Sequence, residues 1–247
     1  MFKVGFELDS AASLLQLDDI ERRQIPFAQV LTATRLAQRV KKGMLPVMKA
    51  RLDRPTPTTL NSLFTKAATT SGKPAEVYFK DSWTSGIPAD VYLQQAVTGG
   101  LRPHKRFEKA LIARGVMQAN EYAVPTAPFM NQYGNVSRGT MTKILSGMGA
   151  ASLRAGYQAN ATNSRRSKAK GNAHRYFSAE VDGARGVWER VSMGMGDAVR
   201  PVFVFSASAP RYRTIFPFFK IGENIIKANH TAEFAQAFAD AVATSDR

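Results

Sequence analysis

The sequence predicts an α+β fold in which a long N-terminal helix and a C-terminal helix pack on an antiparallel sheet. Apolar residues recur every three or four positions between Val30 and Leu52, which is typical of an amphipathic helix. Three strand-like segments, 175–181, 186–191 and 200–206, follow one another with no helical pattern between them. This succession favours an antiparallel meander, and a helical and irregular insertion lies between the helix and the meander.

The long helix is expected to begin near Pro26, because proline is tolerated in the first turn, and Pro46 is expected to kink it or end it. The basic residues Arg35, Arg39 and Lys42 lie largely off the apolar stripe. They form either a solvated charged face or a functional basic face, and the pattern leaves both open.

Shorter elements are expected along the rest of the chain. They are a strand over Phe2–Leu8, a strand over Ala75–Asp81, a helix over Pro88–Val97 ended by Gly99-Gly100, a helix over Lys105–Arg114, an irregular stretch over Tyr122–Asn135, a helix over Gly139–Met148, a tight Asp182-Gly183 turn and a last helix through Ile225 and Val242.

These elements predict one domain with an interruption. Residues 1–100 form its N-terminal part, residues 101–174 form a helical and basic irregular insertion or arm, and residues 175–247 complete the same domain with the meander and the last helix. The hydrophobic periodicity disappears between Gly149 and Asn172, so this segment is expected to be a mobile loop or an inserted arm.

The chain is strongly basic and has no cysteine. Its 34 Lys and Arg exceed its 19 Asp and Glu by 15 charges, and its pI is near 10.3. Such an excess indicates contact with nucleic acid or with another anionic surface. The missing cysteines exclude disulfides and suit a reducing cytosol, and no apolar run reaches the roughly 20 residues of a membrane-spanning helix. A soluble protein without a membrane partner is expected.

A basic run, NSRRSKAKGNAHRYF, occupies Asn163–Phe177, and no acid lies between Glu121 and Glu180. We expect its first ten residues to be a flexible arm that orders against an anionic partner, with Tyr176 or Phe177 anchoring its base in the core. The candidate contact residues are Arg154, Arg165, Arg166, Lys168, Lys170 and Arg175, together with Arg35, Arg39 and Lys42 of the long helix.

No catalytic pattern accompanies this charge. The histidines His104, His174 and His230 are far apart in sequence, and the acids are mostly isolated. We therefore expect no enzyme activity, no catalytic or metal-ligating residues and no cofactor.

Several segments carry a resemblance to known proteins. The pieces RPTPTTLNSLFTKAAT, VYFKD, YLQQAVTGGLRPHKRFEKAL, YAVP and YGNVSRGTMTKILS, within 25–147, resemble a set of phage-encoded virion proteins. The pieces VWERV and RPVFVF, followed by an amphipathic helix, are similar to the closing section of the minor tail protein Z (tail-completion) family.

The resemblance implies a structural virion protein at the neck or portal–tail junction, assembled in the host bacterial cytoplasm as a ring of copies. Its implied partners are the portal or adaptor, the tail tube or the tail terminator, and packaged DNA. The phenylalanines of TIFPFFK, Phe216, Phe218 and Phe219, are candidates for the contact between copies, and the core is their competing destination. The alternative is a non-specific nucleic-acid-binding protein that acts in phage genome packaging or replication.

Overall fold

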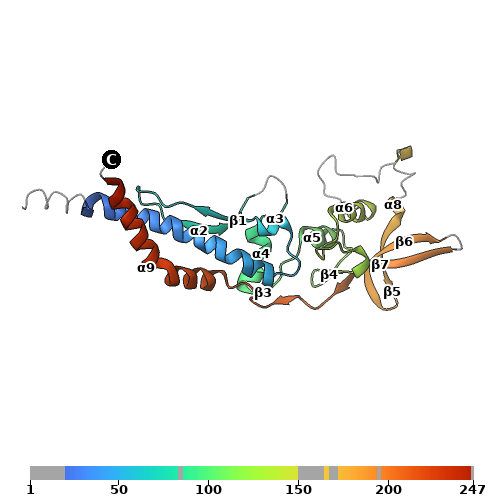
Figure 1. Ribbon diagram of the computed structural model, residues 1–247. Coiled ribbons are helices and arrows are strands. Elements are labelled where there is room, and N and C mark those ends of the chain that lie inside the picture. The colour runs from blue at the N-terminus through green and yellow to red at the C-terminus, as the bar shows by residue number, and fades with distance from the viewer. Residues whose placement is uncertain (1–19, 83–85, 150–163, 167–171, 194–195, 246–247) are drawn as a thin grey trace, which may run out of the picture. The chain divides into compact units, whose positions relative to one another are not determined.

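The computed structural model describes residues 20–82, 86–149, 164–166, 172–193 and 196–245 (Figure 1). The fold is α+β, as predicted, and the chain divides into two compact units. Unit 1 comprises residues 1–98 and 215–247, and unit 2 comprises residues 99–214. Unit 2 is thus inserted between the last short helix of unit 1 and its C-terminal helix.

Unit 1 is mainly helical. Its elements are η1 (Ile20–Gln24), α2 (Ile25–Arg51), α3 (Pro57–Leu60), β1 (Leu63–Lys66), β2 (Glu76–Phe79), α4 (Ala89–Thr98) and α9 (Phe218–Ser245). Strands β1 and β2 form an antiparallel pair with Leu63 opposite Phe79. The predicted strand over 75–81 contains β2, whereas no strand was predicted at β1.

Helix α2 buries the stripe that its periodicity predicts, including Val40, Met44 and Met48. Pro46 does not end the helix, which continues to Arg51; the proline is exposed, and Met44 and Met48 on either side of it are buried. The long helices α2 and α9 pack side by side (Figure 1). Glycines permit this close approach: a Cβ on Gly43 would lie 2.7 Å from Ile225 Cδ1, and one on Gly222 3.4 Å from Met44 Cε.

Unit 2 contains the meander and the helices that cover it. Its elements are β3 (Gly100–Leu101), α5 (Arg106–Ala113), β4 (Tyr122–Pro125), η2 (Ala127–Phe129), α6 (Arg138–Gly147), α8 (Asn172–Arg175), β5 (Tyr176–Val181), β6 (Ala184–Met193), β7 (Gly196–Ser206) and β8 (Arg211–Tyr212). The four-stranded antiparallel sheet has the order β4-β7-β6-β5. Strands β3 and β8 pair where the chain enters and leaves the unit.

The predicted turn between β5 and β6 is confirmed. Asp182 and Gly183 both have positive φ, 52° and 75°, as a two-residue hairpin requires, and Val181 pairs with Ala184 across it. Tyr176 is buried at the start of β5 in a core shared with Phe107, so it anchors that strand as expected.

The predicted domain boundaries differ from these units. The long helices pack on each other and on β1 and β2, whereas the meander belongs to unit 2 together with residues 99–149. The reason is β4, which lies in the stretch predicted to be irregular and pairs with β7 from Tyr122 opposite Ser206 to Pro125 opposite Phe203. This pairing joins the expected insertion to the expected closing sheet.

Candidate anion-binding surface

Most of the excess positive charge belongs to unit 2. Residues 99–214 contain 18 Lys and Arg against 6 Asp and Glu, a net charge of +12, whereas the rest of the chain contains 16 against 13, a net charge of +3. The basic residues of unit 2 are 13 arginines and 5 lysines. The positions of its few acids therefore decide how much of this charge reaches the surface.

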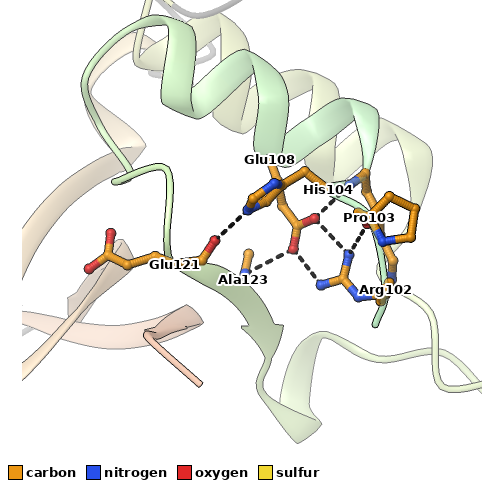
Figure 2. Close-up of polar contacts among 7 residues, drawn as sticks. Arg102, Pro103, His104, Glu108, Glu121 and Ala123 are labelled. Atoms are coloured by element: carbon orange, nitrogen blue, oxygen red, sulfur yellow. Dashed lines mark hydrogen bonds and ion pairs between the residues drawn. The ribbon is translucent and has the colours of Figure 1, made fainter. Parts of the chain in front are cut away.

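Glu108 is buried beneath the first turn of α5 (Figure 2). Arg102 donates two hydrogen bonds to its carboxylate, at 2.6 and 2.7 Å, and the backbone N–H groups of Lys105 and Ala123 donate two more, at 2.6 and 3.0 Å. Glu108 is the third residue of the helix, and it caps the N-terminus through Lys105. Burial acts to raise its pKa, but the bonds from Arg102 and the backbone outweigh burial and lower it.

Glu121 is the second buried acid. It accepts a hydrogen bond from the Gln118 N–H at 2.7 Å, and its carboxylate lies 3.3 Å from Arg185 Nη1. The Glu121 carbonyl lies 2.9 Å from His104 Nε2, a contact that Figure 2 marks with a dashed line. The imidazole of His104 also stacks on the ring of Tyr122. His104 thus holds the loop before β4 in place, which is a structural role.

Glu189 of β6 is the third buried acid of unit 2. Its side chain points to the inner face of the sheet, in the cross-strand row formed by Tyr176, Glu189 and Arg200. Arg175 Nε donates to Oε1 at 2.5 Å, and Arg200 Nε donates to Oε2 at 2.6 Å. Burial acts to raise the pKa of Glu189, and these two arginines outweigh it and lower the pKa.

Half of the acids of unit 2 are therefore buried in internal ion pairs, while many basic side chains remain at its surface. The following are exposed and form no ion pair among the side chains that the structure describes: Arg106, Lys109, Arg114, Arg138, Arg165, Arg166, Arg190, Arg211 and Arg213. Such a surface attracts polyanions without selecting a sequence.

The arm residues of the basic run are only partly described. Arg165 and Arg166 are exposed in the short piece 164–166, and Arg154, Lys168 and Lys170 lie outside the described residues, as does most of the expected arm. Arg175 is described: its Nε binds Glu189 at the base of the run, and its side chain is 45% exposed.

Two of the three basic residues predicted for this face of the long helix form ion pairs within unit 1. Arg35 pairs with Asp240 at 2.7 Å, and Arg39 pairs with the buried Glu233, so both arginines bind α2 to α9. Lys42 is exposed. The sequence pattern could not anticipate these pairs, because the partners are about 200 residues apart, and a long-range contact leaves no local signal.

The three candidate contact phenylalanines have three different environments. Phe216 is buried in the core of unit 1 with Met44 and Leu93, so its competing destination, the core, is the observed one. Phe218 is half-buried, and Phe219 is 77% exposed. Phe219 alone among them retains an exposed ring.

Arg102, Glu108, Glu189 and Arg200 were not among the predicted residues. Glu189 had a detectable signal: in VWERV it alternates with Val187 and Val191 and so falls on an apolar face. Within the described ranges, no group of three or more His, Asp or Glu is placed to hold a metal ion. No helix among them is long and apolar enough to cross a membrane.

Comparisons with protein-family models, with curated proteins and with solved structures find no match to this chain.

Proposed function

We propose that this chain is a non-enzymatic structural component of a bacteriophage virion, a ring-forming neck, tail-completion or minor tail protein at the portal–tail junction. In this proposal unit 2 contacts packaged DNA or the acidic surface of a neighbouring ring, and the other partners are the portal or adaptor and the tail tube or terminator.

The observation that carries the proposal is the separation of charge in unit 2. Glu108, Glu121 and Glu189 are buried in ion pairs, and the exposed basic side chains of unit 2 that the structure describes are mainly arginines. Arginine suits phosphate recognition because its planar guanidinium presents several N–H donors. The resemblance of segments within 25–147 to phage virion proteins supports a location in the virion.

The contact between copies is assigned to the exposed ring of Phe219 at the start of α9. Its neighbours include the exposed Ile226 one to two turns further along the helix. A large exposed aromatic ring beside apolar side chains is a common feature of subunit contacts.

Mass spectrometry and electron microscopy of purified virions test the location. The proposal expects the protein among the virion proteins and density for a ring on the portal–tail axis. Absence of the protein from purified particles contradicts it. Phe219→Ser is expected to abolish the ring measured by analytical ultracentrifugation, whereas Phe64→Ser, which changes another exposed phenylalanine, is expected to leave it intact.

The second candidate is a non-specific nucleic-acid-binding protein that acts free in the cytosol in genome packaging or replication. The same exposed arginines favour it, because binding to phosphates needs no base-reading element. It expects tight, salt-sensitive DNA binding by a monomer that is absent from the virion, so particle composition separates the two candidates.

A further inference from the structure

The two arginines bound to Glu189 use only a small part of their hydrogen-bonding capacity. Each donates through Nε alone, and a guanidinium has five N–H donors. Among the described residues, no other hydrogen bond of Arg175 or Arg200 is found, so the terminal Nη1 and Nη2 groups of both remain available. The side chains are 45% and 50% exposed, so these groups are accessible to a ligand.

The position of the pair is fixed by the sheet. Arg175 is the last residue of α8, and Arg200 lies in β7 directly opposite Glu189 of β6. Both guanidiniums lie against the two oxygens of one buried carboxylate, which holds them close together. Their planes are also supported by rings, since Arg200 lies 4.8 Å from the Phe129 centroid and Arg175 lies 5.7 Å from the Tyr176 centroid.

The charge of the cluster is also unbalanced. Two arginines share one carboxylate, so the cluster keeps a net positive charge after Glu189 has been neutralised. A single arginine neutralises the charge of a buried glutamate, as Arg102 does for Glu108, where two backbone N–H groups complete the hydrogen bonding. The second arginine therefore adds a positive charge that neutralisation of Glu189 does not require.

We propose that Arg175 and Arg200, oriented by Glu189, form a phosphate-binding fork for the DNA backbone. Guanidinium edges match the oxygens of a phosphodiester, and fixing them in advance lowers the entropy cost of binding. This inference rests on the proposed polyanion contact of unit 2 and names two residues that make it. DNA is favoured over an acidic protein because the net charge of +12 on unit 2 suits a continuous polyanion.

Chemical modification of the wild-type protein tests the fork without any substitution. The full-length chain is treated with phenylglyoxal, which modifies accessible arginines, with and without a DNA duplex, and the sites are quantified by mass spectrometry. DNA is expected to protect Arg175 and Arg200, while the enclosed Arg102 should react little in either state. Equal reactivity of Arg175 and Arg200 with and without bound DNA overturns the inference.

Binding measurements on variants complete the test. In fluorescence anisotropy with the duplex over a salt series, Arg175→Gln/Arg200→Gln is expected to lower the slope of log Kobs against log salt by about two units, close to 0.9 for each phosphate that is no longer neutralised. The control Arg211→Gln/Arg213→Gln makes the same charge change elsewhere in unit 2 and is expected to lower it less. Circular dichroism and thermal unfolding confirm that each variant is folded.

A charge-preserving variant separates geometry from charge. Arg175→Lys/Arg200→Lys is expected to bind more like the glutamine variant than like wild type, because an ammonium cannot bind Glu189 and present a planar donor edge together. Wild-type binding by the lysine variant overturns the fork and leaves the proposed function in place. Absence of any DNA binding by a protein that is present in virions also overturns the fork, and it indicates an acidic protein partner for unit 2.

Discussion

Two buried glutamates of unit 2, Glu108 and Glu189, are neutralised in different ways. Glu108 has one arginine, bound through two nitrogens and only 11% exposed, and two backbone N–H donors complete its shell. Glu189 has two arginines, each bound through Nε alone and each about half exposed to solvent. The first arrangement is closed and holds the fold together, whereas the second leaves cationic groups at the surface.

The comparison shows how a basic unit can bury acids and still present positive charge. A buried carboxylate needs a partner, because an unpaired charge in the interior costs several kcal/mol. Where the arginine is enclosed, as Arg102 is, the ion pair presents little charge to solvent. Where the partners are about half exposed, as Arg175 and Arg200 are, the same requirement leaves guanidinium groups at the surface.

The largest effect is expected at the closed site. Glu108→Ala leaves Arg102 partly buried without a counter-charge and removes the cap of α5, so the free energy of unfolding is expected to fall by about 3–5 kcal/mol. Urea denaturation followed by circular dichroism measures this. The exposed Glu180→Ala is the control and is expected to change stability little. If Glu108→Ala lowers the free energy of unfolding no more than the control does, Glu108 does not stabilise the fold.

A smaller effect is expected at the open site. Glu189→Gln keeps the shape of the side chain but removes the charge, and its two arginines can turn to water because they are half exposed. The free energy of unfolding is expected to fall by about 1.5–3 kcal/mol, the range for hydrogen bonds to charged groups. The same urea experiment measures it. A decrease in the free energy of unfolding larger than that of Glu108→Ala contradicts the expected order of the two sites.

The smallest expected effect is the dependence of stability on pH, which arises from proton binding by Glu108 and Glu189. The pKa of each carboxyl is lowered in the folded protein, because its arginine hydrogen bonds outweigh burial. Their contribution to stability is therefore fully present above the unfolded pKa of about 4.3 and is lost as pH falls through the lower folded values. Urea denaturation at a series of pH values is expected to show that the free energy of unfolding falls at acid pH. Glu108→Gln and Glu189→Gln should each make this fall with pH less steep. An unchanged pH dependence in both variants contradicts the lowered pKa values of the two carboxyls.

Local patterns predicted much of this fold. Periodicity alone indicated α2, α4, α5 and the meander, and the Asp182-Gly183 turn followed from the backbone freedom of those residue types. Strand β4 was missed because it has four residues, ends in Pro125 and gains its order only from pairing with β7. Short segments of this kind depend on tertiary contacts more than on propensity.

The ion pairs of the candidate anion-binding surface were harder to predict from the sequence. The acid-free run lies in unit 2, which has most of the excess positive charge, but the sequence does not show which charges are buried together. Arg175 lies 14 residues from Glu189 and Arg200 lies 11, on different elements that only the sheet register brings together. Arg35 and Arg39, which seemed from the sequence to offer a free basic face, have carboxylate partners on α9. Charge density is visible in a sequence, whereas pairing depends on the fold.

The most direct test of the central claim compares equal charge changes in the two units. Arg106→Gln/Arg114→Gln removes two exposed charges from unit 2, and Lys42→Gln/Lys49→Gln removes two from unit 1. DNA binding by each full-length variant is measured over a salt series. The unit 2 variant is expected to bind DNA more weakly and with a lower salt slope, whereas the unit 1 variant is expected to bind like wild type. Equal reductions in both variants, or a larger reduction in the unit 1 variant, would contradict it.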